Sequence, residues 1–468
     1  MGFWIKILLD MLEIIKGMFK RLSSIFHFKD KHQARPWLEF YDENVPADVI
    51  VPDASLVTYL EKTVKESPDK IFINYFNRKI SYGDFDQCVK RCAAGFQKRN
   101  IGKGDRVALV LPNTPQFLIA YWAALTIGAI VVLINPLLSA REMKQQLGLV
   151  SPKMIVILDR LFDSLIKEVG SSLKAVLVTA SVTSFLPPIK RLAFHISQPS
   201  KWPIMRPATT VPGMPFRELL REKTSPALAQ VRGETPAVLL FTGGVTGVPK
   251  ATMLTHKNLI ANVLQGITWM RNILSTDQVI MGALPFMHSY GMTASHHLAI
   301  FTQNTLLLEP RFNIRKVIKD IKNFKVTIFP GVPTMFQALL DKFPQDSKTS
   351  LKVCISGGAP LSKELQRAFY EKFNVPLIQG YGLSEASPIT HCNPVHGVKK
   401  EGSIGLPWPG TDAKIVHLTT GQTRGINKRG ELWVKGPQIM KEYWQNPQET
   451  KMVLKDGWLA TGDIAYYD

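Results

Sequence analysis

Hydrophobic and polar positions repeat with two different periods along most of this chain. From Ala54 to about Val169, and again from Thr235 to Ile378, helix-like spacing of apolar residues alternates with short apolar runs typical of buried strands. Such alternation predicts a mostly parallel sheet covered by helices. Beyond Glu401 the pattern changes to short strands between glycines, as in GELWVKG at 430–436. The sequence therefore predicts an α/β fold with a β-rich end.

One uncharged stretch, from Val107 to Ala140, is long enough to resemble a membrane span. Prolines interrupt it early, and a glycine and an Asn-Pro pair interrupt it late. We therefore favour the protein core over a membrane. The pattern predicts one β-α-β unit of a covered sheet, with a strand at 106–111, a helix at 116–127 and a strand at 129–134.

The first 28 residues carry one polar stripe on an otherwise apolar helix. Charged residues recur every three or four positions, at Lys6, Asp10, Glu13, Lys16 and Lys20. These charges argue against a spanning helix, and no small-residue cleavage site marks a signal peptide. The pattern favours a helix lying on an anionic membrane surface. A helix docked on the protein's own surface is the alternative.

Composition narrows the class of protein. Of the 468 residues, 45% are hydrophobic and 20% are charged, which is typical of a globular chain. The net charge of +20 raises the question of nucleic acid, but the lysines are spread along the chain instead of forming a stripe with aromatics. The four cysteines form no metal-binding pattern, and Cys88 and Cys92 fit one buried helix face. A reduced, cytoplasmic setting without nucleic acid is expected.

Four segments follow from these patterns. Residues 1–28 form the membrane-surface helix, and 29–52 form a proline-containing linker. Residues 53–400 form the α/β core, with a Pro-rich insertion or surface loop at about 197–216, and 401–468 form the β-rich unit.

The stretch FTGGVTGVPKATMLTH at 241–256 places three glycines and two threonines ahead of one lysine, directly after an apolar run. Such a loop can wrap phosphate with backbone N–H groups and hydroxyls while the lysine balances charge. An ordinary Gly-rich turn is the alternative. A Walker loop is excluded, because Pro249 precedes the lysine and Ala251 follows it. No GxGxxG fingerprint is present.

Four further stretches complete the pattern, namely LPFMHSYG (284–291), SGGAPL (356–361), QGYGLSEASP (379–388) and DGWLATGD (456–463). In this order they resemble the adenylate-forming (AMP-binding) superfamily. TGG at 242–244, MLTHKNL at 253–259 and DGWLATGDIA at 456–465 are most similar to bacterial long-chain fatty acid–CoA ligases. The resemblance runs from about Trp37 to the last residue.

This resemblance implies the large N-terminal domain of such enzymes, with two stacked α/β subdomains and a small β-barrel subdomain. It also implies a ligase activity. ATP would activate a long-chain fatty acid as acyl-adenylate with release of diphosphate, and coenzyme A would then displace AMP. The chemistry needs donors, a cation and Mg²⁺, because two anions must meet. A ligase for another carboxylic acid, an acyl-AMP ligase and a catalytically weak ATP- and acyl-binding module are alternatives.

The resemblance also assigns roles to residues. Lys250, His288 and Glu385 are the expected catalytic residues, and Glu385 with Thr242 is expected to hold Mg²⁺, whose preferred ligands are hard oxygens. His288 would border the carboxylate and the coenzyme A entrance. The nucleotide-binding residues would be Thr242, Gly243, Gly244, Thr246, Gly247, Lys250, Gly358, Ala359, Pro360, Gly380, Tyr381, Gly382, Ser384 and Asp463.

Each single assignment has a simpler alternative. Glu385 by itself could be a solvated loop residue, His288 a core histidine and Asp463 a turn residue. Their occurrence together in the family order favours the functional interpretation.

Two features depart from the family. Val245 stands where the family loop carries a second threonine, so one phosphate donor is missing, and Ala251 replaces the usual glycine. The sequence also ends at Asp468, inside the fatty-acyl signature. We therefore expect the hinge and the mobile C-terminal lid, which supplies a catalytic lysine, to be absent from this chain. Peripheral attachment to the inner face of the membrane and a homodimer are further expectations.

Overall fold

The computed structural model describes residues 35–170, 174–197, 213–242, 249–345 and 348–468. The predicted membrane-surface helix at 1–28 lies outside these residues, as do most of the Pro-rich segment and part of the glycine-rich loop. Among the described helices, none has the length and apolar character needed to cross a bilayer. The predicted segment limits at 28, 52 and 400 stay predictions.

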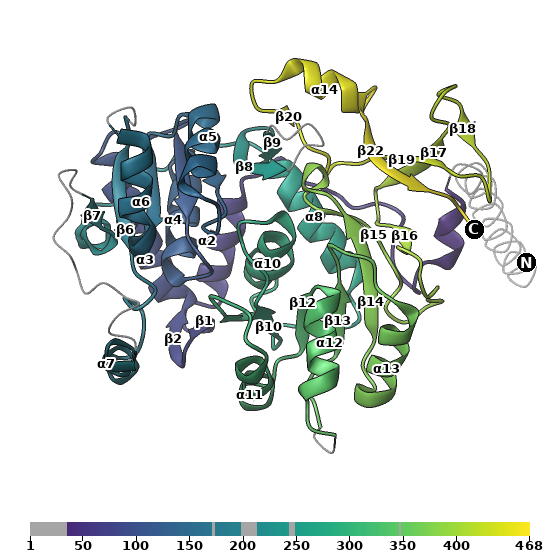
Figure 1. Cartoon of the computed structure of the whole chain (residues 1–468), viewed down its shortest axis with the longest axis horizontal. Coiled ribbons are helices and arrows are strands. Elements are labelled where there is room, and N and C mark those ends of the chain that lie inside the picture. Colours follow the sequence, from purple (N-terminus) through teal and green to yellow (C-terminus); the bar gives the residue numbers. More distant parts are fainter. Residues whose placement is uncertain (1–34, 171–173, 198–212, 243–248, 346–347) are drawn as a thin grey trace, which may run out of the picture.

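An eight-stranded sheet organises the N-terminal half of the chain (Figure 1). Neighbouring strands β3, β4, β5, β6 and β8 run parallel. In spatial order the strands are β20 (Glu442–Tyr443), β9 (Lys250–Thr255), β8 (Pro236–Thr242), β4 (Ile130–Leu133), β3 (Arg106–Val110), β5 (Met154–Leu158), β6 (Val176–Ala180) and β7 (Met214–Pro215).

The uncharged stretch belongs to this sheet. Between β3 and β4 lies α4 (Pro115–Thr126), and every residue of this helix is buried. Its start is fixed by Thr114, whose side chain accepts a hydrogen bond from the backbone N–H of Phe117, and by a proline in the first turn. The predicted β-α-β unit of the core is confirmed.

The prediction of a loop or insertion at 197–216 was wrong for Met214 and Pro215. They pair with β6 as the edge strand β7. Pairing at a sheet edge uses backbone groups, so it needs no alternation of hydrophobic side chains that a sequence pattern could reveal.

A nine-stranded sheet organises the second half, and β1, from early in the chain, joins it by pairing in parallel with β11. In spatial order the strands are β16 (Leu406–Pro407), β15 (Ile389–Cys392), β14 (Leu377–Gly382), β13 (Val353–Ser356), β12 (Ile328–Gly331), β10 (Val279–Gly282), β11 (Thr305–Leu308), β1 (Ile71–Tyr75) and β2 (Arg78–Ser81).

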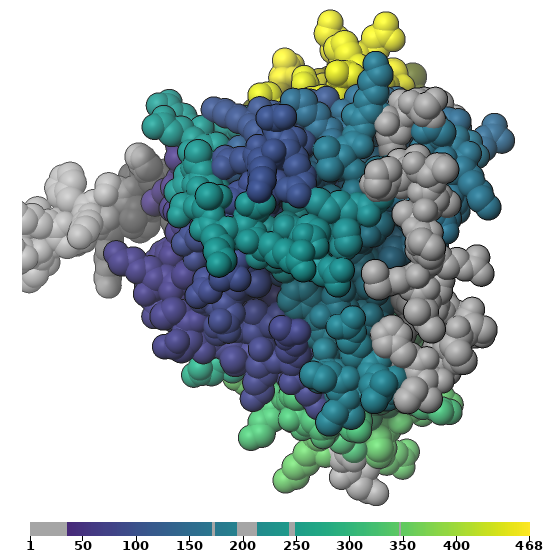
Figure 2. Space-filling model, turned by 90° about the vertical axis from the view of Figure 1, so that its left-hand side faces the viewer, coloured from purple at the N-terminus to yellow at the C-terminus, as the bar shows by residue number. Residues whose placement is uncertain are grey.

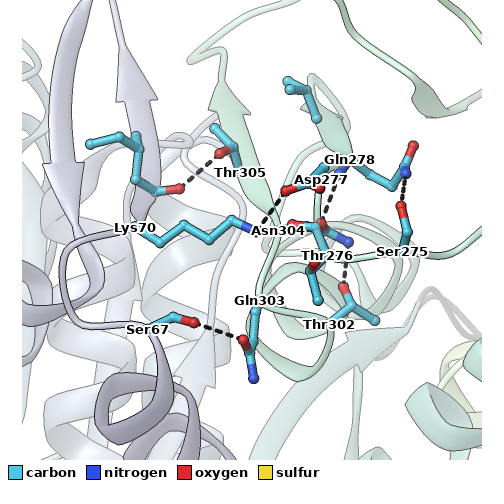
Figure 3. A network of polar contacts seen from close by, with 12 residues as sticks. Ser67, Lys70, Ser275, Thr276, Asp277, Gln278, Thr302, Gln303, Asn304 and Thr305 are labelled. Carbon is cyan, nitrogen blue, oxygen red and sulfur yellow. Dashed lines mark hydrogen bonds and ion pairs between the residues drawn. The ribbon is translucent and has the colours of Figure 1, made fainter.

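Polar contacts reinforce the place where β1 joins this sheet (Figure 3). Lys70 forms an ion pair with Asp277 at 3.5 Å, and the Ser67 hydroxyl donates to the Gln303 side chain at 2.8 Å. The Thr305 hydroxyl donates to the Ile71 carbonyl at 2.8 Å. These contacts fasten the first strand of the chain to residues more than 200 positions later.

The β-rich end forms an antiparallel five-stranded sheet. In spatial order its strands are β18 (Thr423–Arg424), β17 (Asp412–Val416), β19 (Gly430–Lys435), β22 (Trp458–Ala465) and β21 (Leu454–Lys455).

Helices make layers around the two large sheets (Figure 1). One apolar cluster lies between the eight-stranded sheet and the outer helices α5 (Ala140–Val150) and α6 (Asp159–Val169). A second lies between the nine-stranded sheet and the outer helices α11 (Ile314–Phe324), α12 (Pro333–Lys342) and α13 (Lys363–Phe373). The largest cluster includes the helices α2 (Leu56–Glu66), α3 (Tyr82–Gln97), α4, α8 (His256–Trp269) and α10 (Leu298–Phe301).

Shorter or peripheral helices complete the described chain. They are η1 (Pro36–Phe40), α7 (Pro188–Ser197), η3 (Phe216–Arg221), α9 (Ser289–Gly291), the π-helix η4 (Met292–His297), η5 (Ser384–Ala386) and α14 (Pro447–Val453). Figure 2 shows the side of the molecule where early segments, coloured purple to teal, cover most of the surface. Green segments reach this side at its lower edge and yellow segments at its upper edge.

The cysteines behave as expected from their spacing. Cys92 is buried and Cys88 is half-buried on α3, and all four thiols are free. The prediction of one buried helix face is confirmed.

Asn113 links the two large sheets, and its replacement by alanine should destabilise the protein. Its side chain, 3% exposed, donates to the carbonyls of Gly282 (3.1 Å) and Leu284 (2.7 Å) and accepts from the N–H of Phe286 (2.8 Å). Asn113→Ala leaves the Leu284 carbonyl and the Phe286 N–H without these partners, whereas the Gly282 carbonyl still accepts from the Glu309 N–H, so we expect a loss of roughly 2–4 kcal/mol in the free energy of unfolding. Denaturant unfolding measures it.

The control is Asn323→Ala, at an exposed position of α11. It should change the free energy of unfolding by no more than about 0.5 kcal/mol. Equal unfolding midpoints for the two variants would contradict the linking role of Asn113.

Candidate active site

The glycine-rich loop connects the antiparallel strands β8 and β9. Thr242, the last residue of β8, lies opposite Lys250, the first residue of β9. Residues 243–248 lie outside the described part of the chain, and they include Gly243, Gly244, Val245, Thr246 and Gly247. The hairpin therefore places the two ends of the predicted phosphate loop side by side.

Lys250 is held by two side chains from the C-terminal segment 401–468. Its Nζ lies 2.5 Å from a carboxylate oxygen of Glu449 and 5.6 Å from the centre of the Tyr443 ring. Tyr443 reaches this position because β20 pairs with β9. Glu449 lies in the first turn of α14, which Asn446 caps by accepting from the Glu449 N–H. The ammonium group is thus already paired with an anion.

Glu385 is buried beside the same tyrosine. Its side chain is 9% exposed and accepts a hydrogen bond from the Tyr443 hydroxyl at 2.8 Å. Burial raises the pKa of Tyr443, and the neighbouring Glu385 carboxylate raises it further, so the hydroxyl stays protonated and can donate. Ser384, next to Glu385, lies 3.5 Å from the Ser289 hydroxyl. Tyr443 therefore connects the surroundings of Lys250 with Glu385.

A second tyrosine, Tyr381, contacts Asp463. The Tyr381 hydroxyl donates to the Asp463 carboxylate at 2.5 Å, joining β14 to β22. Burial raises the pKa of Tyr381, and the hydrogen bond to Asp463 adds to the effect. The Asp463 side chain is exposed, so it can also accept hydrogen bonds from a ligand.

The two small-residue stretches leave neighbouring parallel strands at the same edge. Exposed Gly358, Ala359 and Pro360 follow β13, and Gly380 and Gly382 lie in β14. A Cβ at position 382 would lie 2.0 Å from the Pro388 carbonyl oxygen, so only glycine fits there. Gly358 has a φ of +78°, which other residues rarely adopt. Ligands of open α/β sheets bind outside such strand ends.

Three cavities surround these residues. One of about 230 Å³ is lined by Glu385, Tyr443, Thr461 and Gly462 among others, and a second of about 310 Å³ by residues including Thr242 and His288. The third, of about 1190 Å³, is a largely apolar crevice lined by Tyr75, Phe76, Leu158, Val182, Leu186 and Met335 among others. Met287 lines both the second cavity and the crevice.

Some of the predicted site residues are therefore linked by side-chain contacts, and others only line the same cavity. Contacts link Lys250 to Glu385 by way of Tyr443, and Tyr381 to Asp463. His288 has an exposed side chain and shares a cavity with Thr242. Within the described ranges no hydrogen bond joins His288 to Lys250 or Glu385.

Sequence reasoning missed Tyr443 and Glu449. Both lie in EYWQNPQET at 442–450, where an aromatic pair precedes a capped helix start. This stretch could have been singled out as a further motif, but no spacing rule connects it with residue 250 or 385.

Comparisons with known proteins indicate the family of this chain. The model of the family described as "AMP-binding enzyme" matches residues 60–444. The chain is 38% identical to the long-chain-fatty-acid–CoA ligase of Bacillus subtilis, over 93% of this chain and 78% of that protein. It is 33% identical to the corresponding ligase of Haemophilus influenzae, over 88% and 75%.

A solved structure has the same fold. The crystal structure of ATP-bound MatB from Rhodopseudomonas palustris matches with a TM-score of 0.76 and 25% identity, covering 89% of this chain and 77% of that one.

Proposed function

The chain belongs to the AMP-binding enzyme family, and from this premise we propose that it is a ligase that activates a long-chain fatty acid with ATP and transfers the acyl group to coenzyme A. The fatty acid carboxylate would attack the α-phosphorus of ATP, giving acyl-adenylate and diphosphate. The thiolate of coenzyme A would then attack the acyl carbon, and AMP would leave. The named relatives are long-chain-fatty-acid–CoA ligases, which supports this choice.

The observation that carries the choice of substrate is the apolar crevice. Its volume of about 1190 Å³ and its aromatic and aliphatic lining suit a long hydrocarbon chain. Met287 lines both the crevice and the cavity lined by Thr242 and His288, so the two cavities are adjacent. An acyl chain in the crevice would therefore bring its carboxylate to the end of the predicted phosphate loop, with His288 beside it.

The nucleotide would lie along the edge formed by β13, β14 and β22. Asp463 would accept hydrogen bonds from the ribose hydroxyls, and Tyr381, held by Asp463, would pack against the adenine. Gly358, Ala359 and Pro360 would border the other face of the base. Thr242 and Lys250, with the loop between them, would hold the phosphates, and the ammonium group would stabilise negative charge that builds up during transfer.

Mg²⁺ is implied by the family, and the described residues fit it. No group of three or more His, Cys, Asp or Glu side chains among them is placed to hold a metal ion. Mg²⁺ is commonly held by one or two carboxylates together with substrate phosphates, and Glu385 is a buried carboxylate of this kind. Glu385 and Thr242 would hold the ion, which supplies charge neutralisation at the phosphates when bound.

ATP–diphosphate exchange with a series of acids tests the proposal. Exchange should be fastest with palmitate, slower with octanoate and weakest with benzoate or an amino acid. Fastest exchange with benzoate would contradict the choice of substrate. Tight binding of a palmitoyl-adenylate analogue without exchange, and without acyl-CoA formation when coenzyme A is added, would instead support the binding-module alternative.

The pairing of Lys250 with Glu449 gives a second expectation for this site. If Lys250 binds phosphate, it must exchange the Glu449 carboxylate for a phosphate oxygen, and that exchange costs binding energy. Glu449→Gln keeps the shape but removes the charge, so the dissociation constant of ATP should fall by about threefold to tenfold. Calorimetric titration with ATP measures it, and Glu442→Gln is the control. Weaker ATP binding by Glu449→Gln would show that this carboxylate supports the site.

A further inference from the structure

Helix α7 carries apolar side chains that the described part of the chain leaves exposed. The side chain of Ile189 is 84% exposed and that of Leu192 is 62% exposed. Because they are three positions apart, they lie on the same side of the helix. Single exposed apolar residues are ordinary, but a helical pair flanked by the exposed cations Lys190 and Arg191 is typical of a helix that lies at a lipid–water interface.

This helix lies at the opening of the apolar crevice. Lys190 and Ala193 line the crevice, and the Lys190 ammonium donates to the Phe76 carbonyl at 2.9 Å. Leu137, another crevice residue, is 79% exposed. The outward apolar pair of α7 is therefore next to the entrance of a cavity that suits a hydrocarbon chain.

Basic residues surround the same opening. Phe76 lies in the turn between β1 and β2, and the Lys316 ammonium of α11 lies 4.7 Å from the centre of its ring. The turn thus connects α7 with α11, which lie along the lower edge of the molecule in Figure 1. Exposed cations on these elements and the crevice rim are Arg78, Lys79, Arg160, Arg191, Arg311, Arg315 and Lys319.

Two acidic residues at this edge are buried and both contact Lys316, namely Glu309 and Asp320. Burial raises the pKa of Glu309 to about 8, so at pH 7 it is mostly protonated and the Lys316 ammonium balances the Asp320 carboxylate. The edge therefore presents cations together with apolar side chains, which is complementary to a bilayer containing anionic lipids.

We propose that the edge formed by α7, the β1–β2 turn and the start of α11, hereafter the loading edge, docks on an anionic lipid bilayer. Ile189 and Leu192 enter the headgroup layer, and the cations contact lipid phosphates. An acyl chain could then pass from the bilayer into the crevice with little exposure to water. The docking does not depend on the function proposed above. Only the identity of the molecule that enters the crevice, a fatty acid, rests on that function.

Depth-sensitive quenching at single labelled sites of the full chain tests the docking. A fluorophore is attached at Leu192→Cys, and in a second protein at Leu149→Cys on α5, which lies at the upper edge of the molecule in Figure 1, whereas α7 lies at the lower edge. Both carry Cys88→Ser, which removes the half-buried native thiol. With phosphatidylglycerol vesicles whose acyl chains carry bromine, the label at 192 should be quenched severalfold more than the label at 149.

Equal quenching at the two sites, or none at position 192, would overturn the proposal. This holds even when another segment brings the protein to the vesicles, because the readout is local to α7. Quenching at 192 that is as strong in pure phosphatidylcholine would also contradict it, since charge complementarity would then play no part. Neither ATP nor fatty acid is present, so the result does not depend on catalysis.

A charge-reversal pair gives a second, independent measurement. Arg191→Glu with Arg315→Glu should reduce quenching at position 192 on phosphatidylglycerol vesicles and raise the vesicle concentration for half-maximal quenching by about tenfold or more. Lys144→Glu with Lys174→Glu, in a separate hollow between α5 and the end of α6, makes the same change in net charge. An equal shift by both pairs would show that total charge, not the loading edge, governs the contact.

Discussion

Glu385→Gln is expected to lower the rate of ATP-dependent acyl-adenylate formation by about 10²–10³-fold, the scale found when one preorganised electrostatic group is removed from an active site. The buried carboxylate is the expected Mg²⁺ ligand among the described residues, and a neutral amide is a poorer ligand for a hard cation. Glutamine keeps the volume and can still accept from the Tyr443 hydroxyl. ATP–diphosphate exchange with palmitate, measured over a range of Mg²⁺ concentrations, reports the loss.

Tyr443→Phe tests how much the orientation of the Glu385 carboxylate matters when its charge is kept. This variant removes the hydrogen bond to Glu385 but keeps the negative charge and the ring beside Lys250. We expect it to lose about tenfold in rate, because one hydrogen bond to a charged group is removed. If Glu385→Gln retained activity above that of Tyr443→Phe, the metal-binding role of Glu385 would be untenable.

Acidification from pH 7.5 to 5.5 is expected to cost about 5 kcal/mol of the free energy of unfolding through four buried histidines, partly offset by Glu309, whose pKa burial raises to about 8 so that it binds a proton in the folded state first. Burial lowers the pKa of His256 to about 4 and of His297 and His391 to about 3, and it lowers the pKa of His296 well below the ordinary value. In the unfolded chain these groups bind protons near pH 6.5, so the unfolded state gains protons first. The histidine contribution to the free energy of unfolding therefore rises with pH between 5.5 and 7.5, and it is lost as the pH falls through this range.

His296→Leu tests whether the buried histidines cause this dependence of the unfolding free energy on pH. Neither ring nitrogen of His296 has a hydrogen-bond partner in the described part of the chain, and the ring packs against Phe286. The variant should remove about a quarter of the histidine contribution to the pH dependence of the unfolding free energy, since one of the four buried histidines is gone. His396→Gln, at an exposed position, should leave the slope unchanged. Denaturant unfolding at a series of pH values distinguishes the two outcomes.

The sequence alone determined the class of fold, several elements and the family. The β-α-β unit between Arg106 and Leu133 was predicted almost to the residue, because a buried strand and a buried helix differ in length and in the turn residues that bound them. The family could be identified because its motifs are short stretches in a fixed order. The helix face of Cys88 and Cys92 followed from local spacing in the same way.

Only the tertiary structure decided how distant segments meet. The pairing of Lys250 with Glu449 spans 199 positions, and the hydrogen bond from Tyr443 to Glu385 spans 58. The placement of β1 beside β11 and the position of the crevice next to the cavity lined by Thr242 and His288 likewise depend on which sheet each strand joins. Periodicity shows which face of an element is buried but not which element covers it, because many partners offer an equally apolar surface.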